Sequence, residues 1–162
     1  GIVLDLRNDP GGYLDVAVNL AGWFLPRGTV VLKEAYRDGS SEEFRANGNE
    51  AFVGTPVVIL LNEGSASASE ILAGTLRDNR GAKIVGEQSF GKGTVQQIEP
   101  LRDGSTLKIT VANWVLPKGQ VLEGKGLAPD IEVKLSDEDR EKKRDPQLGR
   151  ALKVIREEVG KR

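Results

Sequence analysis

The apolar run VVILL at residues 57–61 is the feature that most constrains how this chain can fold. A short apolar run bounded by turn residues is typical of a buried strand. The small-residue turn GSASASE at 64–70 follows it and leads into a predicted helix from Ser67 to Asn79. Strand and helix signals alternate in this way along the whole chain, which predicts an α/β fold with a mixed β-sheet and packed helices.

The remaining predicted elements follow the same alternation. The turn RNDPGG at 7–12 separates a first strand from a helix. The polar stretch 37–51 is interpreted as a surface hairpin or loop, and the terminal helix from Asp145 is amphipathic. The other predicted strands cover residues 1–6, 29–36, 82–87 and 131–135, a hairpin covers 94–99 and 105–116, and a helix covers 13–24.

Length and charge limit the classes of protein to consider. A chain of 162 residues can bury one hydrophobic core, and we predict a core over 1–135 followed by a charged segment with a helix over 136–162. The net charge of −1 gives no indication of the excess positive charge that binding to nucleic acid or to an anionic membrane requires. The chain opens directly on a core-like strand, so we expect a fragment that is incomplete at the N-terminus.

The chain contains no histidine and no cysteine. Within this chain, that composition excludes a histidine-assisted serine and a cysteine thiolate as nucleophiles, and it leaves a serine activated by a lysine. No cluster of acidic residues has the spacing of metal ligands, so neither a metal nor another cofactor is expected.

Three serines in the GSASASE turn are candidate nucleophiles: Ser65, Ser67 and Ser69. A helix N-terminus offers free N–H groups and the positive end of a dipole, which suit an oxyanion. The alternative is structural, because Ser67 and Glu70 match a capping box. Local sequence alone favours capping over catalysis.

Lys92 is the candidate base because glycines flank it in FGKG, and flanking glycines permit close packing. A lysine acts as a base only where desolvation or cationic neighbours lower its pKa. The alternatives are a surface turn, or a phosphate loop, which Gly93 disfavours because it replaces the magnesium-binding Ser or Thr. Lys83 opens a strand and is expected to point outward.

Three further polar residues have structural interpretations. Asp78, near the end of a predicted helix, is expected to be a solvated helix-end residue. Arg7 could anchor the glycine-containing turn by hydrogen bonds, and Asp5, between two leucines, would need a partner if it is half-buried.

At these residues the chain resembles the carboxyl-terminal processing peptidases, also called tail-specific proteases, which are serine endopeptidases with a Ser–Lys pair. The resemblance extends over nearly the whole chain in the same order. The matching segments are LDLRNDPGG at 4–12, GSASASEILAGTLRD at 64–78, GEQSFGKGTVQ at 86–96, GLAPDIEV at 126–133 and DPQLGRAL at 145–152.

The resemblance implies a role for each matching residue. The nucleophile falls on Ser67, the general base on Lys92, and the residue that orients the lysine on Gln96. The oxyanion hole would be formed by the backbone N–H groups of Ala68 and Gly12. The implied fold is the Clp-protease/crotonase-like α/β core.

The implied activity is cleavage of proteins or peptides near apolar C-termini through an acyl-enzyme. The resemblance also implies a PDZ domain upstream in the parent protein, a place outside the cytoplasm in the periplasm or cell envelope, and a possible homo-oligomer. Two other functions stay open: a catalytically silent peptide-binding or assembly module, and a crotonase-type acyl-CoA enzyme, which lacks an evident acid/base carboxylate pair here.

Overall fold

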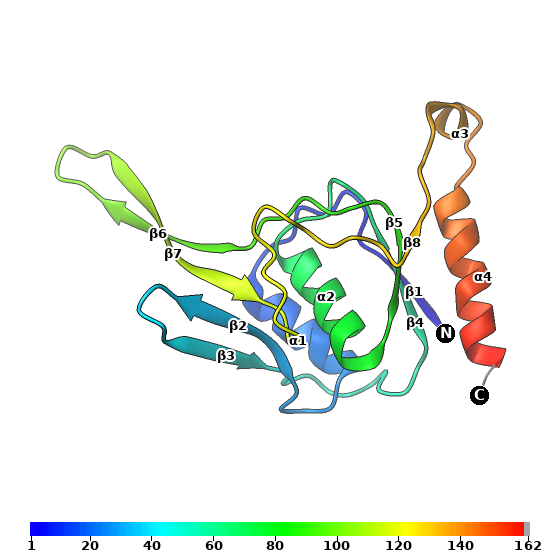
Figure 1. The fold of residues 1–162 in the computed structure, drawn as a ribbon, viewed down its shortest axis with the longest axis horizontal. Coiled ribbons are helices and arrows are strands. Elements are labelled where there is room, and N and C mark those ends of the chain that lie inside the picture. The colour runs from blue at the N-terminus through cyan, green and yellow to red at the C-terminus, as the bar shows by residue number, and fades with distance from the viewer. Residues whose placement is uncertain (161–162) are drawn as a thin grey trace.

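The computed structural model describes residues 1–160, in which single helices separate groups of strands and two helices close the chain (Figure 1). The helices are α1 (Leu14–Phe24), α2 (Ala68–Arg80), α3 (Asp137–Glu141) and α4 (Pro146–Gly160). The strands are β1 (Ile2–Asp5), β2 (Val30–Tyr36), β3 (Ser41–Arg45), β4 (Val57–Leu61), β5 (Lys83–Gly86), β6 (Thr94–Pro100), β7 (Thr106–Val115) and β8 (Ile131–Glu132). In the described part of the chain, no helix has the length and apolar character needed to cross a bilayer.

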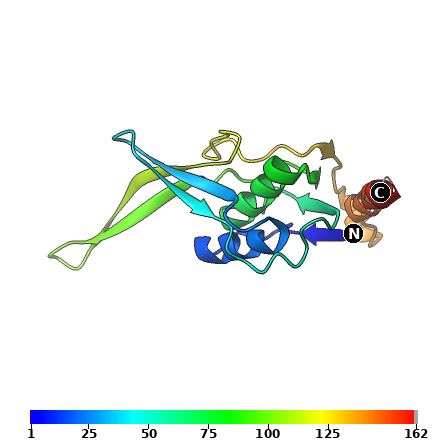
Figure 2. The same ribbon diagram turned by 90° about the horizontal axis from the view of Figure 1, so that it is seen from below.

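The strands form two separate sheets. One is parallel, with the order β1-β4-β5-β8, and the other is antiparallel, with the order β3-β2-β7-β6. The expected α/β class is therefore confirmed, and the parallel and antiparallel pairings are divided between two sheets. The β6–β7 hairpin extends away from the helices in both views (Figures 1 and 2).

Strand β4 lies at the centre of the packing, and all five of its residues are buried. Successive side chains of a strand point to opposite faces of the sheet, and here the two faces have different covers. Ile59 and Leu61 pack into the core formed with α1 and α2, whereas Val58 and Leu60 pack against α4. Helices thus cover both faces of the parallel sheet, as parallel sheets require.

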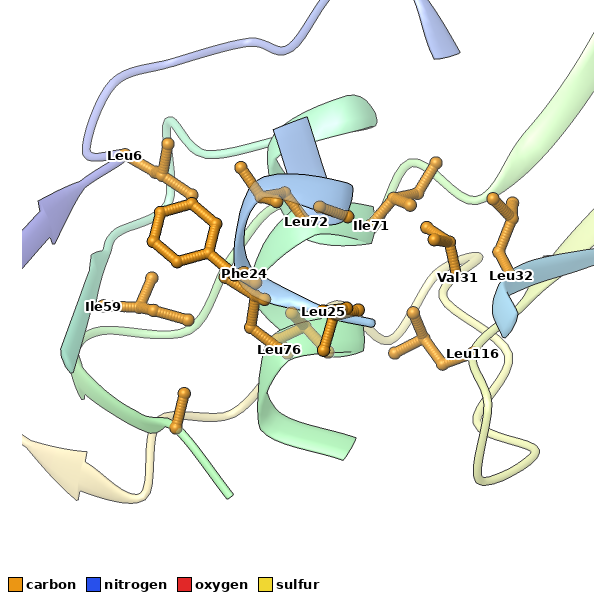
Figure 3. Packing of buried hydrophobic residues seen from close by; sticks show 14 of the residues in the cluster. Leu6, Phe24, Leu25, Val31, Leu32, Ile59, Ile71, Leu72, Leu76 and Leu116 are labelled. Atoms are coloured by element: carbon orange, nitrogen blue, oxygen red, sulfur yellow. The ribbon is translucent and has the colours of Figure 1, made fainter. Parts of the chain in front are cut away.

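The larger core joins the two sheets through α2. Leu6, Phe24 and Ile59 lie together on one side of this helix, and Val31 and Leu32 of β2 lie on the other (Figure 3). Ile71 and Leu76 of α2 are completely buried between them. Burial of each such side chain contributes roughly 1.5–3 kcal/mol, so α2 and its preceding turn are held firmly in place.

The polar stretch 37–51 contains β3, which pairs with β2, so the expected surface hairpin is confirmed. Two other segments differ in detail from the sequence-based expectations. The last strand is only Ile131–Glu132 rather than 131–135, because β8 pairs with β5 at just two positions. The short helix α3 was not expected, since it has no apolar face and is instead stabilised by a capping box between Ser136 and Asp139.

Candidate active site

The turn between β4 and α2 carries Ser67 in an unusual backbone conformation. Ser67 has φ 58° and ψ −120°, and it immediately precedes the first residue of α2. A residue other than glycine with positive φ is strained, and such strain persists only where the surroundings enforce it. The completely buried α2 side chains on one side and the end of β4 on the other supply this constraint.

The hydroxyl groups of Ser65 and Ser67 in this turn differ in their hydrogen-bond partners. Ser65 accepts a hydrogen bond from the Asn62 N–H (3.0 Å) and donates one to the Leu6 carbonyl (2.8 Å), so it holds the turn together. The Ser67 hydroxyl occupies the N-cap position of α2, where Ser67 and Glu70 form a capping box, and Ser67 is only 6% exposed. Ser65 is thus bound to a different segment of the chain, whereas the capping box of Ser67 is local to the start of α2.

Glu70 connects the Ser67 turn to the loop that carries Lys92. It is completely buried, and its Oε2 accepts from the N–H groups of Ser67 (2.8 Å) and Lys92 (3.0 Å). Its Oε1 accepts from the Ser89 hydroxyl (2.5 Å) and the Gly91 N–H (2.8 Å). Hydrogen bonds to a carboxylate are roughly twice as strong as neutral ones. One buried side chain therefore fixes both backbones relative to each other.

Sequence reasoning identified Glu70 only as the capping partner of Ser67. That part is confirmed by its bond to the Ser67 N–H. The bonds to Ser89, Gly91 and Lys92 were missed, because they join residues about twenty positions apart across a helix and a strand. The available signal was an acidic residue among small and apolar neighbours, since a buried carboxyl group requires several donors.

The glycine-containing turn packs directly against the Ser67 turn. Gly11 has φ +88°, and a methyl group there would lie 2.5 Å from the Ala66 carbonyl oxygen and 2.7 Å from the Ala68 nitrogen. Only glycine therefore fits this position. The Gly11 N–H is used by Asp9, whereas within residues 1–160 no acceptor takes the N–H of Gly12 or of Ala68. The two amides predicted for the oxyanion hole are unused donors.

The side chains of Lys92 and Gln96 are both exposed to solvent. The structure anchors the Lys92 backbone through Glu70 and leaves the Lys92 side chain exposed rather than closely packed. Gln96 lies on β6 next to a bulge between Val95 and Gln96. Lys83 is exposed, as expected.

Asp78 is not the solvated helix-end residue that the sequence suggested. Only 6% of its side chain is exposed, and its carboxylate accepts from the Lys118 N–H (3.0 Å). It thereby fixes the turn that follows β7. A structural role for Asp78 follows from this contact.

An apolar pocket of about 240 Å³ opens beside Gly12 and Ala68. Leu6, Ala17 and Leu72 contribute to its walls. Tyr13 and Val16 border the pocket and are largely exposed. An apolar pocket next to unused amide donors can hold an apolar side chain while a neighbouring carbonyl group reaches the amides. Within residues 1–160, no group of acidic side chains is arranged to hold a metal ion.

Comparisons with known proteins agree with this architecture. The sequence model of Peptidase family S41 matches residues 1–133. The chain is 39% identical over 137 residues to the carboxy-terminal processing protease CtpA of Bacillus subtilis, an alignment that covers 85% of this chain and 29% of the relative. It is 46% identical over 130 residues to the carboxyl-terminal-processing protease of Synechocystis sp., which covers 80% of this chain and 30% of that relative.

A solved structure supports the same relationship. The photosystem II D1 C-terminal processing protease superposes with a TM-score of 0.76 at 40% identity, covering 82% of this chain and 34% of that chain. This match confirms the expected Clp-protease/crotonase-like fold. The chain thus spans only about a third of the length of such relatives. The match over 1–133 and the shared fold establish that this chain belongs to peptidase family S41.

Proposed function

We propose that this chain is the catalytic core, residues 1–135 with the appended segment 136–162, of a serine endopeptidase that processes the C-terminal regions of proteins. The observation that carries the proposal is the buried Glu70, whose carboxyl group binds the N–H groups of both Ser67 and Lys92. The unused amides of Gly12 and Ala68 beside an apolar pocket support it further.

In the proposed mechanism Lys92, as a neutral amine, takes the proton of the Ser67 hydroxyl. The Ser67 oxygen forms a bond to the carbonyl carbon of the peptide, and the negative charge on the carbonyl oxygen is stabilised by the N–H groups of Ala68 and Gly12. Collapse of this intermediate breaks the C–N bond, and Lys92 returns the proton to the leaving amine. Water, deprotonated by Lys92, then forms a bond to the acyl carbon, the bond from this carbon to the Ser67 oxygen breaks, and Lys92 returns the proton to Ser67.

The exposed Lys92 side chain must turn toward Ser67 for this chemistry. Because its backbone is anchored to Glu70, only the flexible four-carbon side chain has to move. Gln96 would accept a hydrogen bond from the amine and orient it. Enclosure by the substrate would also remove water around the lysine, which favours its neutral form.

The proposed substrates are proteins or peptides with apolar C-termini, because the pocket beside the amides is lined mainly by apolar side chains. The relatives are about three times longer than this chain, and an upstream PDZ domain that recruits the C-terminus by strand addition belongs to the proposal. A location outside the cytoplasm and a homo-oligomeric state are further parts of it.

The test is cleavage of a peptide with an apolar C-terminus by the natural full-length protein. We expect Ser67→Ala and Lys92→Ala each to lower kcat by about a thousandfold or more. Lys83→Ala is the matched control, since it removes another exposed lysine, and it should leave kcat unchanged. Undiminished cleavage by either catalytic variant would overturn the mechanism.

A silent peptide-binding module is the second candidate, because Ser67 is buried while Lys92 is exposed. Reaction with a fluorophosphonate, followed by mass spectrometry, separates the two functions. Labelling of Ser67 that is lost in Lys92→Ala supports the peptidase. A folded protein that binds the peptide but shows no labelling supports the module.

A further inference from the structure

The first turn of α4 reaches the edge of the parallel sheet where the strands end. Gln147 in this turn is only 1% exposed. Its Oε1 accepts from Arg7 Nη1 (3.0 Å), and its Nε2 donates to Glu87 Oε2 (3.1 Å) and to the Val133 carbonyl (2.8 Å). One side chain thus binds three segments that are distant in the sequence.

Each of these partners lies just beyond the end of a different strand. Arg7 follows β1, which ends at Asp5. Glu87 follows β5, and Val133 follows β8, with no residue between. Gln147 therefore connects the segments that follow the C-terminal ends of three of the four strands in the parallel sheet.

Two of the segments that follow these strands lead directly to the candidate active site. The segment from Arg7 continues to Gly12, and the segment from Glu87 continues to Lys92. The remaining strand, β4, leads to Ser67 and is tied to the first segment, because the side-chain amide of Asn62 donates to Asn8 Oδ1 (2.9 Å).

Arg7 is held from α4 by a second contact. Its guanidinium group forms ion pairs with Asp5 (2.7 Å) and Asp145 (2.8 Å), and Asp145 immediately precedes α4. Hydrogen bonding to Arg7 holds the pKa of both carboxyl groups below their usual range. The ion pairs and the Gln147 amide together attach the start of α4 to the glycine-containing turn.

Apolar contacts alone would be enough to dock α4 on the sheet. Ala151, Val154 and Ile155 already pack against Val58, Leu60 and Val85. A buried amide adds a requirement that apolar packing does not impose, since each of its partners must lie at one distance and angle or remain unsatisfied. The apolar contacts therefore attach α4 to the sheet, and the polar contacts fix the exact position of the attached groups.

We propose that Gln147 is a positioning residue, which sets the glycine-containing turn and the lysine loop relative to each other from outside the site. This inference rests on the proposed function and deepens it, and it assigns a role to a helix that lies beyond the residues matched by the family model. Gln147 acts through Arg7 and Glu87 and does not itself contact the substrate.

The test compares Gln147→Met with Val154→Ala in the full-length protein. Methionine keeps the approximate size of glutamine and removes its hydrogen bonds, whereas Val154→Ala weakens the apolar docking of the same helix. We expect Gln147→Met to lower kcat about 10- to 100-fold with KM changed less than about threefold, since small displacements of reacting groups have effects of this size. Val154→Ala should lower the melting temperature and leave kcat within about twofold while the protein remains folded.

A conservative exchange provides the rescue. In Gln147→Glu the bond from Arg7 can persist, but a carboxyl oxygen then faces both the Glu87 carboxyl group and the Val133 carbonyl oxygen. Adding Glu87→Gln places a donor opposite the acceptor at position 147. We expect the kcat of the double variant to be at least about fivefold higher than that of Gln147→Glu. A merely structural role predicts recovery of melting temperature without recovery of kcat.

Hydrogen exchange supplies a readout that is independent of catalysis. We expect Gln147→Met to speed amide exchange severalfold in both segments 7–12 and 87–92, and Val154→Ala to affect neither selectively. Unchanged exchange in both segments would overturn the positioning role. The role would also be overturned if Gln147→Met and Val154→Ala, compared at equal stability, lowered kcat by the same factor. The proposed function fails separately, if Ser67→Ala still cleaves the peptide.

Discussion

The two halves of the candidate site differ in how completely the fold determines them. On the nucleophile side, the strained Ser67 backbone, the close approach of Gly11 and the buried core of α2 leave little freedom. On the base side, the backbone of Lys92 is anchored, but its side chain is exposed and the chain continues into the projecting β6–β7 hairpin.

This difference indicates that the fold fixes one half of the candidate site and leaves the other half adjustable. In the proposed mechanism the amides of Gly12 and Ala68 and the Ser67 hydroxyl would then be preorganised, which is the arrangement that electrostatic stabilisation of a transition state requires. Lys92, the proposed base, would be the adjustable component, because the proposed mechanism requires its exposed side chain to rotate toward Ser67. The following variants are ordered from the largest expected effect to the smallest, and each tests one part of this contrast.

Glu70 is shared by both halves, so its removal should have the largest effect. Glu70→Ala leaves the buried donors of Ser67, Ser89, Gly91 and Lys92 without their acceptor. We expect the free energy of unfolding to fall by at least about 3 kcal/mol and fluorophosphonate labelling of Ser67 to be lost. Urea denaturation measures the first, and Glu138→Ala, at an exposed position, is the control. A stable, fully reactive Glu70→Ala protein would show that the two halves do not depend on this bridge.

Gly11→Ala tests the nucleophile half alone. The added methyl group would meet Ala66 and Ala68 at a backbone position with φ +88°. We expect a loss of about 1–3 kcal/mol and slower labelling of Ser67. Gly39→Ala is a matched control, because Gly39 has φ +87° but no atom near the added group. Equal effects of the two substitutions would mean that backbone strain alone, and not contact with the Ser67 turn, is responsible.

The ion pairs of Arg7 predict a smaller, pH-dependent effect. Because the pKa values of Asp5 and Asp145 are lower in the folded state than in the unfolded state, their stabilising contribution is present above about pH 4 and is lost as the pH falls through the lowered values. Both carboxyl groups are partly exposed, so we expect about 1 kcal/mol or less.

Arg7→Met should therefore flatten the dependence of unfolding free energy on pH below about pH 4. Urea denaturation at a series of pH values measures this slope. A variant with the same acid dependence as the parent protein would assign the acid sensitivity to other carboxyl groups.

The β6–β7 hairpin should show the smallest effect on stability. Ile98 is 64% exposed there, so Ile98→Thr should change the free energy of unfolding by less than about 0.5 kcal/mol. Ile59→Thr, in the completely buried centre of β4, should cost several kcal/mol by comparison. A large destabilisation by Ile98→Thr in urea denaturation would mean that the hairpin supports the core.

Local patterns predicted most of the helices and strands. The predicted helix 67–79 corresponds to α2 within one residue at each end, because a capping box and apolar spacing both lie within the segment itself. The strands β1, β4 and β5 were also predicted, since short apolar runs between turn residues are local signals.

The sequence could not predict contacts that depend on the assembled sheet. Nothing near Glu70 or Gln147 indicates which distant groups they bind, because those partners come from segments brought together only by strand order. The solvent exposure of Lys92 was likewise not visible, since flanking glycines fit an exposed loop as well as a buried one. The oxyanion amides were predicted by family resemblance rather than by local pattern.

The contacts of Gln147 also bear on the order in which the molecule can assemble. Arg7 and Gln147 are separated by 140 positions, whereas Ser67 and Glu70 are three apart. Contacts between distant residues form slowly because a long loop must close first. During synthesis the local contact between Ser67 and Glu70 can therefore form well before Gln147 ties the sheet edge together, so the candidate nucleophile has one of its contacts before the surrounding loops reach their final positions.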